Sequence, residues 1–561
     1  MRKVFALVYS EIRGLHQSAY LLAGFSLASQ GLALVRDRLF AHYFGAGREL
    51  DVYYAAFKIP DLLFVLFASM LSVYVLIPFI SERTEKDDTA GARAMLSSVL
   101  SVFGMVYVLV AVCVAIFASS LSSFLFPGFV GAEHASLVML LRILLLQPLL
   151  LGISSLYGVI TQLGQRFVLY AVSPLLYNGG IIFGIFVLYP SLGIAGVVWG
   201  VVLGALLHLV IQIPFIRQSH LSPRFTRAID MRVLGTVLVN SMPRALTLSL
   251  SQIVLLAFVG IASTMVAGSV SIFQFAFNLQ SVPLAIIGVS YSVAAFPILA
   301  QLYSKGEMGA FVERVETTLR HLVFWIVPLT GIIIVVRAQI VRTILGSGAF
   351  DWNDTRLTAV ALALFASSLL AQSVNLLIVR AFYAGGNTRT PFIVTVVSTV
   401  VTLVVSFGLY TLFIAHAPFA LFMEKLMRVE GVPGAGIMML PLGYSVVQFG
   451  HMAVLLGIFM HRFQMPFRRL WITSLQSFLA MVGGSGMSYL TLFLLTSAIK
   501  QETFVGIFLQ GLVSGILGSM MVVAILYALK SIELLELWSS LRQRSFVKGI
   551  LGPEKIDTVA L

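Results

Sequence analysis

Long runs of apolar residues, separated by short polar or charged segments, dominate the chain. A helix needs about 20 mostly apolar residues to cross a hydrocarbon core about 30 Å thick. The runs are continuous, whereas membrane strands alternate apolar and polar positions over about 10 residues. The pattern therefore predicts an all-α polytopic membrane protein. Fourteen spans are expected, at residues 17–40, 50–81, 93–119, 135–161, 168–189, 193–216, 234–262, 269–302, 318–338, 357–383, 390–414, 433–460, 470–497 and 503–529.

The composition excludes the other broad classes of protein. The 561 residues are 59% hydrophobic and 11% charged, whereas soluble globular chains are about 25% charged. Disordered chains are polar and poor in aromatic residues, so the same values exclude disorder. The single cysteine, Cys113, rules out an internal disulfide framework and a cysteine-based metal site.

The net charge of +13 comes mostly from the segments that join the spans. Lys and Arg are concentrated in the segments on one side, among them 217–232, 462–469 and the C-terminal tail. Because cytoplasmic loops carry an excess of Lys and Arg, both termini are expected in the cytoplasm. A basic inner face favours contact with anionic membrane lipid, and no nucleic-acid partner is expected.

The two halves of the chain share an internal similarity. The dipeptide Ala-Phe precedes a proline in the second expected span, at Pro60, and again in the eighth, at Pro283. Corresponding segments lie six spans apart in the same orientation, which indicates a parallel, pseudo-twofold repeat about an axis along the membrane normal. The expected parts are an N-terminal lobe at 1–217, a C-terminal lobe at 218–465, two further helices at 466–530 and a cytoplasmic tail at 531–561.

The first two expected spans are rich in charged residues. On insertion scales a charged side chain at the bilayer centre costs about 2.5–3.5 kcal/mol, so it faces protein or a water-filled cavity. Asp51, Lys58 and Asp61 share one helical face because of their spacing. We expect a cavity that binds a charged substrate; the alternative is structural ion pairs, such as Arg36 or Lys58 with Asp51. The candidate cavity residues are Arg36, Asp37, Arg38, Asp51, Lys58 and Arg244.

Several kinds of chemistry lack their sequence signals. The histidines have no metal-binding spacing, and the chain has no phosphate-binding Gly-x-x-x-x-Gly-Lys-Ser/Thr loop. We therefore expect a transporter that is not an enzyme, with no metal site and no cofactor. A coupling cation, Na⁺ or H⁺, is compatible with this expectation, but the sequence identifies no residues for it. Prolines interrupt helical hydrogen bonding, and the hinge candidates are Pro60, Pro243, Pro283 and Pro391.

Short strings spread in order along residues 17–530 carry a family resemblance. They are Val35-Arg36-Asp37, Phe44-Gly45-Ala46-Gly47, Ala56-Phe57-Lys58-Ile59-Pro60, Gln212-Ile213-Pro214, Gly346-Ser347-Gly348-Ala349-Phe350-Asp351, Arg380-Ala381-Phe382-Tyr383-Ala384 and Thr388-Arg389-Thr390-Pro391. These strings resemble the lipid II flippase family (MurJ/MviN) of the multidrug/oligosaccharidyl-lipid/polysaccharide exporter superfamily.

The resemblance implies fourteen helices in two six-helix lobes, with the last two helices forming a groove for a lipid tail. It implies alternating access that moves lipid II, the polyprenyl-diphosphate-linked peptidoglycan precursor, from the inner to the outer leaflet of the bacterial plasma membrane. A central cationic cavity would receive the head group. Membrane lipid and cell-wall synthesis enzymes are the other expected partners, and the expected state is a monomer.

The chain departs from the family pattern at positions where that family has arginines. These positions hold Gln30 in the first span, Phe64 and Val65 in the second and Asn278 in the eighth. Alternative functions therefore stay open: an exporter of another polyprenyl-linked oligosaccharide or a cation-coupled antiporter of the same superfamily, or a non-transporting membrane scaffold for cell-wall enzymes.

Overall fold

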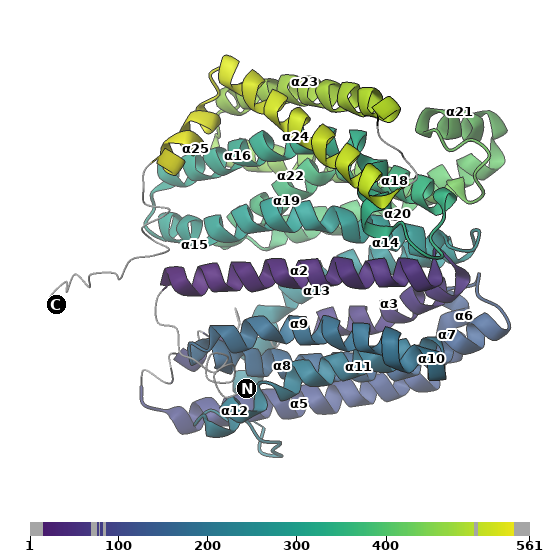
Figure 1. The fold of residues 1–561 in the computed structure, drawn as a ribbon. Coiled ribbons are helices and arrows are strands. Elements are labelled where there is room, and N and C mark those ends of the chain that lie inside the picture. The colour runs from purple at the N-terminus through teal and green to yellow at the C-terminus, as the bar shows by residue number, and fades with distance from the viewer. Residues whose placement is uncertain are drawn as a thin grey trace. The chain divides into compact units, whose positions relative to one another are not determined.

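The elements of regular structure in the part of the chain that the structure describes are all helices (Figure 1). The computed structural model describes residues 15–68, 76–77, 79–81, 83, 86–229, 231–498 and 503–542. Within these residues, eleven helices are long and apolar enough to cross a membrane, or twelve if the broken pair α18 (Trp352–Ser367) and α19 (Leu369–Ala384) forms one span. The prediction of an all-α polytopic membrane protein is therefore confirmed.

These candidate spans correspond to the third to fourteenth spans expected from the sequence. The first two expected spans are also helical, at α2 (Leu15–Phe44) and α3 (Arg48–Ala68), but they are not among the candidates. Charged residues interrupt both helices, and part of the expected span 50–81 lies outside the described residues. The spans that depart from a simple apolar pattern are thus the two that hold most of the candidate cavity residues.

Contacts between residues divide the chain into two compact units. Unit one contains residues 1–282, 341–368 and 386–455, and unit two contains 283–340, 369–385 and 456–561. This division follows a different line from the expected lobes at 1–217 and 218–465, so the lobe boundaries stay a prediction. Besides α2, α3 and α18, unit one holds α5 (Thr89–Ile116), α6 (Ala118–Leu125), α7 (Ala132–Leu144), α8 (Leu146–Leu163), α9 (Phe167–Phe183), η1 (Gly184–Leu188), α10 (Tyr189–Leu192), α11 (Ile194–Val210), α12 (Ile213–Gln218), α13 (Met231–Ser263), nearly all of α14 (Ser269–Pro283), α20 (Arg389–Ala415), α21 (Ala417–Met427), η3 (Ala435–Met438) and most of α22 (Met439–Phe463).

Unit two is built around α16, α23 and α24, which pack side by side (Figure 1). Its apolar core includes Phe324 and Ile332 of α16, Ala480 of α23, and Val522 and Leu526 of α24. The helices α23 and α24 are the two that the resemblance assigns to a lipid-tail groove. Besides α19, this unit holds η2 (Leu284–Val289), α15 (Ser290–Ser304), α16 (Met308–Val335), part of α17 (Arg337–Leu345), α23 (Arg468–Ala498), α24 (Phe504–Ala528) and α25 (Ile532–Arg542).

The short helix α25 is attached to α16 by a buried ion pair. Arg320 Nε lies 3.4 Å from Glu533 Oε1, and both side chains are almost fully buried. Glu533 also accepts hydrogen bonds of 2.8 Å from Thr473 Oγ1 and Ser531 Oγ. Buried charges are tolerated when they are paired and hydrogen-bonded, and this carboxylate meets both conditions.

Glycines allow α9 and α11 to pack with their backbones in contact. A Cβ atom at Gly180 would overlap the backbone of Gly204, and one at Gly200 would lie 2.5 Å from Gly184 Cα. Small residues at helix interfaces permit this close approach in membrane proteins. The segment that follows α9, η1, is π-helical and packs against α11 as well.

We expect Gly180→Val to destabilise the fold by about 1–3 kcal/mol, the usual cost of overpacking a filled interface. The neighbouring Gly179 is the matched control, because a Cβ atom there meets nothing within 4 Å. The thermal unfolding midpoint of the purified protein in detergent measures the difference. Equal midpoints for Gly180→Val and Gly179→Val would contradict close packing at this interface.

Candidate functional site

A chain of polar side chains begins at Arg36 on α2. The guanidinium donates to Asp37 Oδ1 through Nε at 3.0 Å and Nη2 at 2.7 Å. Its third nitrogen, Nη1, donates to Asn178 Oδ1 on α9 at 3.1 Å. The helices α2 and α9 lie side by side, which places these groups within reach of one another (Figure 1). Arg36 is thus held by one charged and one neutral partner.

The chain continues from Asp37 through two amides of α14 to Lys58 on α3. Asn278 Nδ2 donates to Asp37 Oδ2 at 2.9 Å, and Gln274 Nε2 donates to Asn278 Oδ1 at 2.8 Å. Lys58 Nζ donates to Gln274 Oε1 at 2.8 Å. Gln274 and Asn278 are four residues apart, so they lie on one face of α14. We call the set Asn178, Arg36, Asp37, Asn278, Gln274 and Lys58 the polar chain.

The two cations of the polar chain, Arg36 and Lys58, differ in their exposure to solvent. The side chain of Arg36 is 20% exposed, whereas Asp37 and Lys58 are 3% and 6% exposed. An ammonium group has three donors, and among the described residues only Gln274 accepts a hydrogen bond from Lys58. Asp61, three residues further along α3, interacts with Lys58 electrostatically. Arg36 uses some of its N–H groups to bind Asp37 and Asn178, and Lys58 uses one to bind Gln274. The remaining N–H groups of these two cations can donate to an anionic ligand.

Asp51 of α3 is not part of the polar chain; its carboxylate binds the start of α14. Its Oδ2 accepts from Gly268 N at 2.7 Å, and its Oδ1 accepts from Ser271 N at 2.8 Å and Ser271 Oγ at 2.7 Å. The side chain is fully buried. A carboxylate here satisfies backbone N–H groups that have no partner within the helix and complements the helix dipole. The alternative ion pairs of Asp51 with Arg36 or Lys58 are not formed.

Two other arginines, Arg38 of α2 and Arg48 of α3, contact the ends of other helices. Arg38 Nη1 donates to the carbonyl oxygens of Thr343 and Ile344, at 2.6 and 3.2 Å, in the last turn of α17. Arg48 donates from Nε to Glu133 at 2.9 Å, and its guanidinium lies 4.7 Å from the Phe129 ring centre. Arg38 thus binds the end of α17, and Arg48 has a role in packing that the sequence did not indicate.

Four other sequence-predicted residues lie on α2, α3 and α13. Gln30 on α2 is half-buried, six residues before Arg36, and Phe64 and Val65 on α3 are half-buried beyond Lys58. The side chain of Arg244 lies outside the described residues. Of the family's arginine positions represented here, Asn278 is the one that contacts Asp37 directly.

The four hinge candidates occupy different kinds of position. Pro60 lies inside α3, and Pro283 is the last residue of α14, where the helix changes to the π-helical segment η2. Pro391 is the third residue of α20, in a first turn, where a missing N–H breaks no helical hydrogen bond. Pro243 lies within α13, and its side chain is outside the described residues.

Sequence reasoning did not find Gln274 and Asn178, which join the charged members of the polar chain. Amide side chains are uncharged, so the cost of burying a charge does not identify them. A signal was available in the four-residue spacing of Gln274 and Asn278, which places both amides on one face of α14. Metal chemistry has no candidate in the part of the chain described, where no three His, Cys, Asp or Glu residues gather.

A bundle of apolar helices with a polar chain inside it is typical of a membrane transporter, and solved structures with this fold are transporters. Lipid II flippase MurJ in an inward closed conformation is similar with a TM-score of 0.69 at 21% identity, covering 91% of this chain and 99% of that one. A multidrug resistance MATE family transporter of the MOP superfamily, in an inward-facing conformation, is similar with a TM-score of 0.62 at 16% identity, covering 78% and 94%. At these identities the two similarities show that this chain has the same fold.

The family follows from the sequence comparisons. The family model for lipid II flippase MurJ matches residues 40–514, so the chain belongs to the MurJ family. A probable lipid II flippase MurJ from Buchnera aphidicola is 28% identical over 371 residues, which cover 65% of this chain and 72% of the relative. One from Bdellovibrio bacteriovorus is 27% identical over 402 residues, covering 69% and 75%. The resemblance seen in the sequence is confirmed, for a multi-pass protein of a bacterial inner-membrane family.

Proposed function

We propose that this transporter moves lipid II from the inner to the outer leaflet by alternating access. The polar chain is the observation that carries the proposal, together with the family match over residues 40–514. It joins four helices, α9, α2, α14 and α3, and leaves donors at Arg36 and Lys58. A diphosphate is an anion that accepts such charge-assisted hydrogen bonds.

The physical task is to pass a polar, anionic head group through hydrocarbon while its polyprenyl tail stays in lipid. Moving a charge into a low-dielectric medium is costly unless donors replace its lost hydration. Arg36 and Lys58 would supply these donors, and a groove formed by α23 and α24, which the resemblance implies, would hold the tail. Pro60 and Pro283 are the proposed bend points, because both interrupt the regular hydrogen bonding of their helices.

The proposal includes an orientation and a coupling mode. Both termini lie in the cytoplasm, as the distribution of Lys and Arg favours. The protein works as a monomer, and cell-wall synthesis enzymes are its neighbours. Membrane potential or a Na⁺ or H⁺ gradient drives the cycle, since one charge crossing 100 mV gains about 2.3 kcal/mol.

A second candidate cargo is another polyprenyl-linked oligosaccharide. The observation that favours it is Asn278, which contacts Asp37 through a neutral amide at a position where the resemblance implies an arginine. With fewer cations near Arg36, the site would suit a head group with a different charge or a different sugar.

The test is a flipping assay with the purified protein in lipid vesicles. Labelled lipid II and an undecaprenyl-diphosphate-linked sugar without the peptide are compared, with protein-free vesicles as the control. Faster transfer of lipid II supports the first proposal, and faster transfer of the sugar-linked lipid supports the second. Transfer of neither above the control, with correctly folded protein, contradicts both and favours a scaffold.

Asn278→Arg tests whether this position faces the substrate. The new guanidinium would lie beside Asp37 and add a donor for the diphosphate, so lipid II should bind about tenfold more tightly, the value of one charge-assisted hydrogen bond. Binding of fluorescent lipid II in detergent measures the change. Asn387→Arg, in the turn before α20, is the control, and unchanged binding by Asn278→Arg would place the position outside the cavity.

A further inference from the structure

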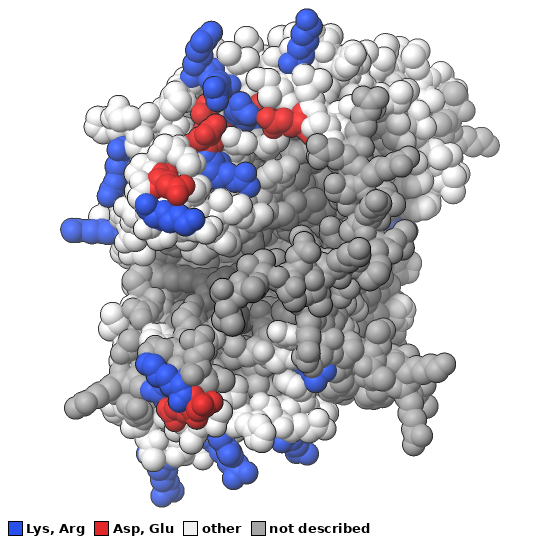
Figure 2. All heavy atoms as spheres, turned by 90° about the vertical axis from the view of Figure 1, so that its left-hand side faces the viewer, with Lys and Arg blue, Asp and Glu red and all other residues white. Residues whose placement is uncertain are grey.

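A charged pocket lies in unit two, away from the polar chain in the sequence. It has a volume of about 1040 Å³ and is formed by the start of α16 and the turn that joins α22 to α23. The lining residues come from the ends of three candidate spans, Met308–Val335, Ala435–Phe463 and Arg468–Ser497. The ends of spans lie at the level of the lipid head groups. Figure 2 looks onto this end of the helices and shows Lys and Arg side chains gathered there, with Asp and Glu among them.

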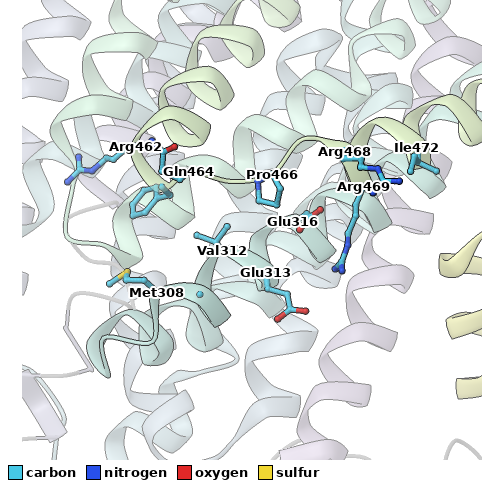
Figure 3. A pocket seen from close by; sticks show the side chains of 12 residues that line it. Met308, Val312, Glu313, Glu316, Arg462, Gln464, Pro466, Arg468, Arg469 and Ile472 are labelled. Carbon is cyan, nitrogen blue, oxygen red and sulfur yellow. The ribbon is translucent and has the colours of Figure 1, made fainter.

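The pocket contains a buried carboxylate with one oxygen atom that lacks a hydrogen-bond partner among the described residues. Glu316 is only 4% exposed, and its Oε1 has no hydrogen-bond partner among the described residues. Figure 3 shows Glu316 beside Pro466, with Glu313 and Arg469 around the same space. Burying an ionised carboxylate without a partner is costly, so a ligand that donates hydrogen bonds to Glu316 would be stabilised there.

The same pocket presents cations that are not engaged by protein carboxylates. Arg462, Arg468 and Arg469 line it and are exposed. Among the described residues none of the three forms an ion pair within 4 Å with Glu313 or Glu316. Guanidinium groups bind phosphate oxygens in a two-pronged geometry. The pocket therefore offers a phosphate site and an ammonium site side by side.

We propose that this pocket binds the head group of an aminophospholipid, a phosphodiester joined to a primary ammonium. Arg468 and Arg469 contact the phosphate, and Glu316 accepts hydrogen bonds from the ammonium, with Glu313 at the rim. An anion without an ammonium group would give Glu316 no hydrogen-bond donor. A cation without a phosphate would be repelled by the arginines. A quaternary ammonium has no N–H to donate, so choline lipids fit less well. The proposal concerns a resident lipid and does not depend on which cargo is transported.

Native mass spectrometry of the detergent-purified protein tests the proposal with three lipids of identical acyl chains: phosphatidylethanolamine, phosphatidylcholine and phosphatidylglycerol. We expect phosphatidylethanolamine to bind about tenfold more tightly than the other two. Glu316→Gln should remove this preference while leaving phosphatidylglycerol binding intact. The double variant Arg468→Ala with Arg469→Ala should weaken the binding of phosphatidylethanolamine and of phosphatidylglycerol by a similar factor.

Two matched controls lie on the same helix or beside it. Arg314 is an exposed arginine of α16 that does not line the pocket, and Glu307 precedes α16 without a side-chain capping bond. Arg314→Ala and Glu307→Gln should keep the wild-type preference. The double arginine variant changes exposed residues only, so it tests the pocket even if Glu316→Gln fails to fold.

Soluble phosphoethanolamine separates the two sources of this chemistry. If it displaces phosphatidylethanolamine only at a concentration far above that of the lipid, the ligand is the membrane lipid; if it competes at an equal concentration, the ligand is a soluble phosphate ester of the same chemistry. Equal binding of the three lipids by the wild-type protein would overturn the proposal. So would an unchanged preference in Glu316→Gln, or unchanged lipid binding in the double arginine variant.

Discussion

Arg36→Ala is expected to lower the rate of lipid II flipping by about 100-fold, because removing one partner of a buried charge pair costs about 2–5 kcal/mol. The substitution removes the most exposed cation of the polar chain and leaves the buried carboxylate of Asp37 with Asn278 as its remaining neutral partner. The measurement is the flipping rate in vesicles that contain equal amounts of inserted protein.

Two variants make this result specific. Arg36→Lys keeps the charge but loses the paired contacts to Asp37 and the contact to Asn178, so it should recover part of the rate. Arg142→Ala removes an exposed arginine of α7 whose Nε donates to the carbonyl oxygen of Ala115, and it should flip at the wild-type rate. Wild-type activity in Arg36→Ala would remove Arg36 from the transport site.

Asp51→Ala is expected to destabilise the protein by about 3 kcal/mol or more. Three donors, Gly268 N, Ser271 N and Ser271 Oγ, would lose their acceptor in a fully buried place, and each unsatisfied buried donor costs about 1–3 kcal/mol. The thermal unfolding midpoint in detergent should fall strongly. Flipping should fall only in proportion to the protein that remains folded.

Graded variants at the same contact separate a structural role from a transport role. Asp51→Asn keeps one acceptor oxygen and should lie between the wild type and Asp51→Ala in stability. Ser271→Ala removes one donor together with its bond and should cost the least. If Asp51→Ala unfolds at the wild-type temperature but no longer transports, Asp51 acts on the substrate and the helix-capping role is wrong.

The helices could be predicted from the sequence for a simple reason. Lipid offers no hydrogen-bond partners, so a chain that crosses it must satisfy its own backbone, and long apolar runs are therefore helices. The same reasoning predicts that Arg36, Asp37 and Lys58 face protein, which the polar chain shows. It does not predict the two π-helical segments, η1 and η2, because their geometry depends on packing against neighbouring helices.

The division of roles among the charged residues could not be predicted. Asp51 and Lys58 lie on one face of α3, as their spacing predicts, and both contact residues in or next to α14. Seven residues of helix rise about 10 Å, so Asp51 contacts the beginning of α14 while Lys58 contacts Gln274, further along. Spacing along one helix gives the shared face, but only the placement of the partner helix decides which charge caps a helix end and which stays available to a ligand.

The ion pair between Arg320 and Glu533 has a practical consequence for handling this protein. A chain shortened before α25 would keep the arginine inside unit two and lose its counter-charge, so the truncation would leave an uncompensated buried cation. Purification tags and fluorescent fusions should therefore be appended beyond Arg542, with α25 left in place. Shorter expression clones that end at α24 are expected to give low yields and unstable samples, whatever their transport activity.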